Sequence, residues 1–345
     1  MRPIKILIAD DSALIRSILK QLLRMAPDLV VVGEASNGEQ AVARCRDLAP
    51  DVIIMDVSMP VMDGLEATRR ITDESRGRVA VMVFSNALDA EVSYRAMRSG
   101  AAEAVRKPEI DRFNEPAYYE AFFEKIRALA GATLAPERVP AGSLRPRNRA
   151  GAGGYRMVVM GASTGGPVAV RTILSALPED LPIGIALVQH MERGFDAGYA
   201  RWLDEATPLS VHLANGPSSA LRPGEVVIAP VDHHLKIDGD RLILDNGPRV
   251  LNQKPSVDVL FQSAAARHRD RIIGILLTGM GRDGAAGCRA IVSGGGVTLV
   301  QDEGTSAIFG MPKAAIEYGG ASLVLPLGEI PGRMLALLRE GGGRR

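Results

Sequence analysis

The sequence lacks the features of a secreted, membrane-bound or nucleic-acid-binding protein. Its 345 residues contain only two cysteines, Cys45 and Cys288, far apart in stretches with helical patterning, which favours a reducing compartment over a disulfide framework. No apolar run approaches the roughly 18 residues of a membrane span, and the opening MRPIKILIADDS is unlike a signal peptide. The 41 basic and 40 acidic residues nearly cancel. We expect a cytoplasmic protein without nucleic-acid binding or membrane insertion.

Short apolar runs do recur through the first 128 residues, with amphipathic stretches between them. The runs cover residues 4–9, 30–32, 52–55, 79–84 and 104–105. This alternation is typical of repeated βα units around a parallel sheet. Between the first two runs we expect a helix that Ser12 caps and that stops at Pro27. Its apolar face would consist of Leu14, Ile18, Leu22 and Met25.

Residues 129–153 separate this first part from a second one. They show no apolar periodicity and are rich in Pro, Gly, Ala and Arg, which is a linker composition. From residue 154 to 345 the alternation resumes, with strands expected at 156–160, 183–189, 226–229, 272–278, 297–300 and 323–325. Asp238-Gly239 lies between two alternating runs, which predicts a β-hairpin. We therefore expect a second α/β domain with a hairpin insertion.

Acidic, hydroxyl and basic side chains follow the expected strands of the first domain. Asp10 and Asp11 follow the first strand, Asp56 the third, Ser85 the fourth and Lys107 the fifth. Parallel strands bring their carboxyl ends to one edge, where three carboxylates would repel one another without a cation such as Mg²⁺. Such a cluster can accept a phosphoryl group on one carboxylate. Ordinary loop acids and a solvated lysine are the alternative for any single residue, but not for five at successive strand ends.

Residues 1–128 resemble the receiver domain of response regulators. The resemblance rests on DDS at 10–12, IIMDVSMPVMDG around Asp56, Ser85, SGA at 99–101 and KP at 107–108. It implies a five-stranded doubly wound, flavodoxin-like sheet and phosphorylation of Asp56 by a histidine kinase. The Mg²⁺ ligands would be Asp10, Asp11, Asp56 and the backbone carbonyl of Ser58, with support for the phosphoryl group from Ser85 and Lys107. Ala104 replaces the aromatic residue of many receivers, a departure that concerns an aromatic switch but not phosphorylation.

In the second domain, GASTGG at 161–166 lies between an apolar run and a helical pattern. G-x-S-x-G in this setting holds a serine on a tight turn with its hydroxyl exposed. A nucleotide-binding loop is the competing interpretation. However, the G-x-G-x-x-G spacing, an acid at the end of the next strand and the lysine of a P-loop are all missing. Ser163 is therefore the candidate nucleophile.

A nucleophilic serine needs a base, and an acid to orient that base. His190 ends the strand that follows the one before Ser163, so both would lie at the same sheet edge. The other histidines, which we interpret as surface or structural residues, are His212, His233, His234 and His268. Asp283 is the only acid in the strand at 272–278 and its glycine-rich loop, whose backbone amides could form an oxyanion hole. The order Ser163, His190, Asp283 differs from that of α/β-hydrolases.

Residues 155 to about 340 resemble the catalytic domain of the CheB family of protein-glutamate methylesterases. The shared motifs are MGASTGGP at 160–167, QHM and GF within 189–195, KPSVDVLF at 254–261, LTGMGRDGAAG at 277–287 and GMPKAAIE at 310–317. The resemblance implies a triad of Ser163, His190 and Asp283 and an oxyanion site at Thr164 and the Met280 amide. Glu192 replaces the proline of the more familiar HMP. No cofactor is expected in this domain.

The resemblance also implies a substrate and a mode of control. The expected reaction is hydrolysis of γ-methyl glutamate esters on methyl-accepting chemoreceptors, with release of methanol, together with deamidation of receptor glutamines. Phosphorylation of Asp56 would relieve an inhibition by the receiver. A transcriptional regulator would need a basic helix-turn-helix domain, which is usually much shorter than the roughly 190 residues here. A non-catalytic module with a degenerate hydrolase fold would not be expected to keep all three triad residues.

Overall fold

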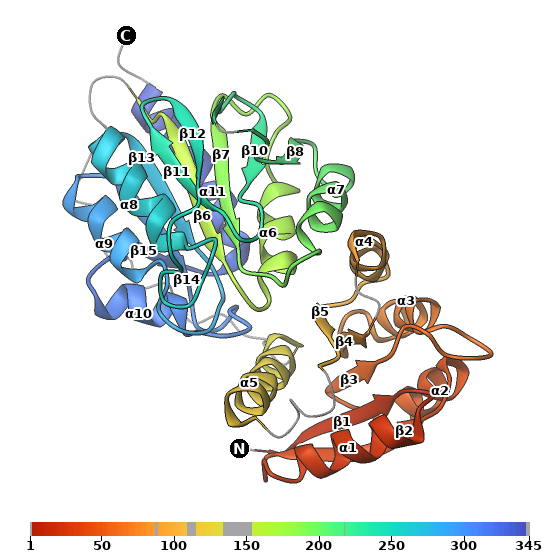
Figure 1. Cartoon of the computed structure of the whole chain (residues 1–345). Coiled ribbons are helices and arrows are strands. Elements are labelled where there is room, and N and C mark those ends of the chain that lie inside the picture. Colours follow the sequence, from red (N-terminus) through yellow and green to blue (C-terminus); the bar gives the residue numbers. More distant parts are fainter. Residues whose placement is uncertain (1, 87–88, 109–114, 134–153, 217, 343–345) are drawn as a thin grey trace. The chain divides into compact units, whose positions relative to one another are not determined.

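The computed structural model describes residues 2–86, 89–108, 115–133, 154–216 and 218–342. The chain divides into two compact units, Met1–Ala135 and Pro136–Arg345, each with its own parallel sheet (Figure 1). Helix α5 (Pro116–Thr133) extends into the segment expected as a linker, because Leu129 and Ala130 are buried in the core of the first unit. The remainder of that segment, from residue 134 to 153, lies outside the described residues.

The first unit is a five-stranded parallel sheet with the strand order β2-β1-β3-β4-β5. Its strands are β1 (Ile4–Ala9), β2 (Leu29–Ala35), β3 (Val52–Met55), β4 (Ala80–Ser85) and β5 (Glu103–Arg106). Besides α5, its helices are α1 (Ala13–Leu23), α2 (Gly38–Leu48), α3 (Gly64–Ser75) and α4 (Ala90–Arg98). Alternate residues of β1 point into two separate apolar clusters, Ile6 and Ile8 into one and Leu7 and Ala9 into the other. The doubly wound α/β fold predicted from the sequence is confirmed.

The predicted apolar face of α1 is partly wrong. Leu14 and Met25 are 58% and 57% exposed, whereas Leu19, Leu22 and Leu23 are buried. Residues spaced by four drift around a helix of 3.6 residues per turn, so a stripe through Leu14 and Ile18 turns away from the core. The predicted cap is present, since the Ser12 hydroxyl accepts a hydrogen bond from the amide of Ile15.

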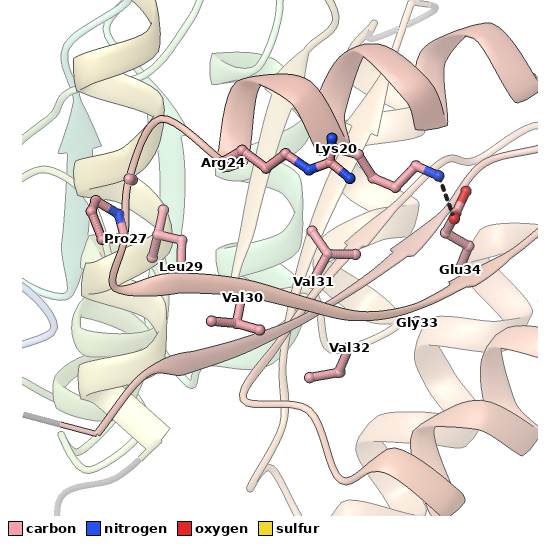
Figure 2. Close-up of a pocket in the computed structure, with 10 residues that line it drawn as sticks. Lys20, Arg24, Pro27, Leu29, Val30, Val31, Val32, Gly33 and Glu34 are labelled. Atoms are coloured by element: carbon pink, nitrogen blue, oxygen red, sulfur yellow. Dashed lines mark hydrogen bonds and ion pairs between the residues drawn. The ribbon is translucent and has the colours of Figure 1, made fainter.

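A pocket of about 530 Å³ lies along β2, at the edge of this sheet (Figure 2). Its lining comes from β2, from the last turn of α1 and from the connection between them, and Lys20 forms an ion pair of 2.7 Å with Glu34. The pocket contains none of the acids predicted to bind a metal or accept a phosphoryl group. We therefore do not assign the predicted chemistry to it.

The second unit has a seven-stranded parallel sheet with the order β15-β14-β13-β6-β7-β10-β8 and a three-stranded antiparallel sheet with the order β11-β12-β9. The strands of the parallel sheet are β6 (Met157–Ala162), β7 (Gly184–Gln189), β8 (Ser210–Leu213), β10 (Glu225–Ile228), β13 (Ile272–Leu276), β14 (Val297–Gln301) and β15 (Leu323–Leu325). The predicted hairpin is present as β11 (His234–Asp238) and β12 (Arg241–Asp245), and β9 (Ser218–Ala220) pairs with β12. Strands β8 and β9 were not predicted.

Helices cover the parallel sheet of the second unit (Figure 1). They are α6 (Gly166–Leu174), α7 (Asp196–Ala206), α8 (Val257–His268), α9 (Ala285–Ser293), α10 (Met311–Glu317) and α11 (Ile330–Gly342). Helices α8 and α9 contact each other and pack against β13, and α11 contacts α6. The strand order reverses between β6 and β13, and in such sheets the crevice at the carboxyl ends of the two strands is where sites form. Ser163 follows β6, and the loop with Asp283 follows β13.

Candidate active site

Ser163 lies on the turn between β6 and α6. Its amide donates a hydrogen bond of 3.0 Å to the carbonyl of Thr278, and its carbonyl accepts one of 2.8 Å from Gly166. Gly165 has a φ of 75°, and a Cβ there would lie 2.4 Å from the Cβ of Ala307. A Cβ at Gly279 would lie 2.6 Å from the Cβ of Ser163. Glycine is thus required both in the turn itself, at Gly165, and in the neighbouring loop, at Gly279. Ser163 therefore lies on a tight turn, as the motif predicts.

His190 follows β7 directly beside Ser163. The register pairs Ala162 with Gln189, and the His190 amide donates to the Ala162 carbonyl at 2.9 Å, so the two residues leave neighbouring strand ends together. The His190 Nε2–H donates a hydrogen bond of 2.8 Å to Asp283 Oδ2. Nδ1 is buried and has no hydrogen-bond partner among the described residues. Because Asp283 holds the proton on Nε2, Nδ1 is the nitrogen left to act as a base.

Asp283 accepts four hydrogen bonds through its two carboxylate oxygens. Besides His190, the donors are the Ser256 hydroxyl at 2.8 Å, the Val257 amide at 2.7 Å and the Asp258 amide at 2.9 Å. Ser256 is the N-cap of α8, so the carboxylate lies at the positive end of that helix. Burial acts to raise the pKa of Asp283, but the bonds from His190, Asp258 and Ser256 outweigh it and hold the pKa below its ordinary value.

Sequence reasoning missed several residues that position this group. The Gln189 side-chain amide donates to the carbonyls of Ser163 at 2.7 Å and of His190 at 3.0 Å, and so ties the two strand ends together. Ser256 and Asp258 lie within the KPSVDVLF motif, yet their contact with Asp283 depends on how α8 approaches the loop. The signal in the sequence was that Gln189 directly follows an apolar run and that Ser256 and Asp258 come just before the apolar residues 259–261.

The predicted oxyanion residues lie on the two loops beside Ser163. The backbone amides of Thr164 and Met280 donate no hydrogen bond to any described residue. The carbonyl of Gly279 accepts bonds from the amides of Gly310 and Met311, at 3.1 and 2.8 Å. A trans peptide directs its N–H opposite its carbonyl, so these two bonds fix the direction of the Met280 N–H. Both amides are thus available to a developing negative charge.

The first unit brings together the acids and the lysine predicted at its strand ends. Asp10, Asp11 and Asp56 each offer an oxygen within 4.8 Å of the others. Lys107 Nζ forms ion pairs with Asp10 at 2.6 Å and with Asp56 at 2.9 Å, and all three of these side chains are buried. Three carboxylates and one ammonium group leave a charge of about −2, which suits a divalent cation with oxygen ligands. The donor set therefore fits Mg²⁺.

The environment of Asp56 differs from that of a simple ion pair. Burial raises the pKa of the Asp56 carboxyl above its ordinary value, Lys107 acts in the opposite direction, and Asp10 adds to the rise. Ser85 is buried, and its carbonyl accepts a bond of 3.0 Å from the amide of Lys107, so both residues lie at this edge. The carbonyl of Ser58 accepts no hydrogen bond from the described residues. It is thus available as a ligand.

Comparison with known proteins identifies both units. The family model described as CheB methylesterase matches residues 158–334, and that of the response regulator receiver domain matches residues 6–115. A protein-glutamate methylesterase/protein-glutamine glutaminase of Anaeromyxobacter dehalogenans is 40% identical over 98% of each chain. The chain belongs to the CheB methylesterase family. It is accordingly a carboxylic ester hydrolase with a receiver domain.

Two further relatives agree with this membership. A protein of the same name from Symbiobacterium thermophilum is 37% identical over 99% of this chain and 98% of its own. The crystal structure of the Thermotoga maritima CheB methylesterase catalytic domain covers 53% of this chain and 98% of that chain, with 37% identity and a TM-score of 0.51. Within the part of the chain that the structure describes, no helix is long and apolar enough to cross a membrane.

Proposed function

We propose that this CheB family member hydrolyses γ-methyl glutamate esters on chemoreceptors through Ser163, His190 and Asp283. The observation that carries the proposal is the bond of 2.8 Å between His190 and Asp283, at the strand end beside Ser163. Asp283 fixes the imidazole with Nδ1 as its free nitrogen. Nδ1 can therefore take the proton of the Ser163 hydroxyl as the oxygen attacks the ester carbonyl.

The remaining steps follow from the same geometry. The amides of Thr164 and Met280 stabilise the negative oxygen of the tetrahedral intermediate. The C–O bond to the methoxy group breaks, His190 returns its proton to the leaving oxygen, and methanol departs. Water then attacks the glutamyl ester of Ser163, with His190 again as the base, and the free glutamate and the serine are restored. A glutamine side chain would react in the same way with loss of ammonia, as the names of the relatives indicate for those proteins.

We further propose that residues 1–128 regulate the catalytic domain at 154–345 in the cytoplasm. Asp56 is the phosphoacceptor for a histidine kinase, and Lys107 and the Ser85 hydroxyl bind oxygens of the phosphoryl group. Mg²⁺ would be held by Asp10, Asp11, Asp56 and the Ser58 carbonyl, and would neutralise charge on the incoming group. In support, Asp10 and Asp56 already share one lysine at a buried strand end. Phosphorylation of Asp56 would relieve inhibition of the esterase.

Methanol release from methylated receptor membranes tests the proposal. We expect the wild type to release methanol, with a further increase on addition of a small phosphodonor and Mg²⁺. Ser163→Ala should release none, and Asp56→Asn should keep its basal rate without responding to the phosphodonor. An absence of release by the wild type would contradict the substrate assignment, and a normal response of Asp56→Asn would contradict the regulation.

A further inference from the structure

Helices α8 and α9 complete each other's N-termini through two buried carboxylates. Asp283, just before α9, accepts the first amides of α8. In the opposite direction, Asp258 in the first turn of α8 accepts a bond of 2.7 Å from the amide of Gly287, in the first turn of α9. The N-cap of α9 is Gly284, which has no side chain to accept these amides, so Asp258 takes that role from another helix.

Asp258 is held tightly in this position. Its side chain is buried and accepts the amide of Gly287, while its own backbone amide donates to Asp283. Asp258 therefore contacts both the start of α9 and the carboxylate of Asp283. Burial raises the pKa of Asp258 to about 6, with a further rise from the nearby charge of Asp283, while bonds from the amides at the start of α9 act against it. Besides Asp283, the titratable group that faces it is the buried thiol of Cys288 on α9.

The connection between Asp283 and α9 is one residue long. That residue, Gly284, has a φ of 93°, and a Cβ there would lie 2.6 Å from Leu276, so only glycine fits the position. A shift of the α9 N-terminus would therefore move Asp283 with it. The bond between Asp258 and Gly287 ties the first turn of α9 directly to α8.

We propose that Asp258 is a positioning residue for the triad, whose carboxylate locks the start of α9 against α8 and so keeps Asp283 aimed at His190. Asp258 does not touch the reacting atoms. It acts through the position of Asp283, and hence through the orientation and basicity of His190. The inference rests on the proposed function, because it assumes that Ser163 is activated by His190.

The test is the reaction of the full-length protein with a fluorophosphonate probe, in which the serine oxygen displaces fluoride from phosphorus. The second-order rate constant reports the activation of Ser163, whereas the final amount of label reports the fraction of folded sites. A residue that only supported folding would lower the amount and leave the rate constant unchanged. Asp204→Ala is the control for the loss of one bond between a carboxylate and a backbone amide, since the exposed Asp204 on α7 accepts the amide of Val211 at 2.7 Å and makes none of the bonds around Asp283.

We expect Asp258→Ala to lower the rate constant roughly tenfold, the scale of one lost hydrogen bond to a charged group. Asp258→Asn keeps an oxygen acceptor for the Gly287 amide and should stay within about threefold of the wild type. If the alanine variant does not fold, Asp258→Ser, whose oxygen is one bond closer to the backbone, takes its place under the same criterion. A rate constant for the alanine or serine variant within about threefold of Asp204→Ala, or no recovery with asparagine, overturns the proposal.

Ser163→Ala separates this inference from the proposed function. If that variant is labelled as fast as the wild type, the nucleophile is misassigned and both proposals fail. If it is not labelled while Asp258→Ala reacts like the wild type, the inference about Asp258 fails alone.

Discussion

Two buried aspartates, Asp56 in the receiver unit and Asp283 in the catalytic unit, have pKa values that are shifted in opposite directions. Their exposed fractions are 6% and 3%, so burial disfavours the charged form of both. Yet the pKa of Asp56 is raised and that of Asp283 is lowered. Asp56 is bound by Lys107, which it shares with Asp10, and by a backbone bond from Val57, whereas Asp283 accepts four hydrogen bonds.

The difference follows from what each carboxylate is proposed to do. An orienting carboxylate must keep its charge and direction, and a full set of donors secures both. A phosphoacceptor must keep an oxygen free for the phosphoryl group and for Mg²⁺, so its charge is only partly compensated before they arrive. For these two aspartates, the larger set of donors thus accompanies the proposed orienting role and the smaller set the proposed reacting one.

Removing the charge of Asp283 should give the largest effect. In Asp283→Asn the imidazolium loses its counter-charge, and the tautomer with the proton on Nε2 is no longer enforced. We expect the rate of methanol release to fall by roughly 10³ to 10⁴-fold, as at other triads. Michaelis–Menten kinetics on methylated receptor membranes would measure it. A loss of less than tenfold would mean that Asp283 does not orient or stabilise His190 as the base.

Asp258 provides a pH test within the same network. Its pKa of about 6 lies above the ordinary value of 3.8, so the folded state binds this proton more tightly than the unfolded state. The stability that this shift contributes is present below about pH 4 and is lost as the pH rises through 6. Relative to the wild type, Asp258→Asn should therefore gain roughly 2 kcal/mol between pH 4 and pH 7. Trp202, the only tryptophan, is buried in α7 and allows fluorescence-detected urea unfolding of the catalytic unit alone.

Ser256 offers a smaller change to the set of donors around Asp283. In Ser256→Ala the carboxylate loses the hydroxyl bond of 2.8 Å but keeps the two amides of α8 and His190. We expect kcat to fall about tenfold with little change in KM, as for the loss of one bond to a charged group. Ser263→Ala is the matched control, because Ser263 lies on the same helix and its hydroxyl bonds with Leu260 and Ile237. Equal effects of the two substitutions would contradict the role of the hydroxyl.

The smallest expected effect is a gain in the stability of the receiver unit. Because the pKa of Asp56 is raised in the folded state, its charge lowers stability above the ordinary pKa. Without Mg²⁺ at pH 7, Asp56→Asn should therefore give a small gain in the stability of the receiver unit, measured by hydrogen exchange of amides in β1 and β3. Asp28→Asn is the control, since Arg127 lowers the pKa of Asp28 and the substitution should not stabilise. If Asp56→Asn destabilised the receiver unit, the charge of Asp56 would be stabilised by folding as that of Asp283 is, and the two aspartates would not differ.

The sequence predicted much of the fold because apolar runs mark buried strands whatever surrounds them. It also placed Ser163, His190 and Asp283 at one sheet edge, since parallel strands share their carboxyl ends. Strands β8 and β9 were missed because they are short, lie at sheet edges and carry mostly polar or small residues. The exposed side of α1 was misassigned because a spacing of four residues resembles a helical stripe over short stretches.

The finer features of the site were not accessible from the sequence. Whether His190 uses Nε2 or Nδ1 toward Asp283 depends on the approach of two loops. The donors from Ser256 and Asp258 depend on where the N-terminus of α8 points, which tertiary packing determines. Hydrogen bonds between residues far apart in the chain leave no periodic pattern in the sequence, so they cannot be predicted from it.

The separation of 93 residues between His190 and Asp283 also has a consequence for biosynthesis. A chain emerging from the ribosome presents Ser163 and His190 long before Asp283, the carboxylate proposed to orient His190, has been made. Closing so long a loop is a late step in folding, because its entropy cost precedes any gain from the contact. Truncated or half-made chains would therefore carry a serine and a histidine but no oriented base. Hydrolytic competence would arise only after Asp283 has been made, when the receiver at residues 1–128 already exists.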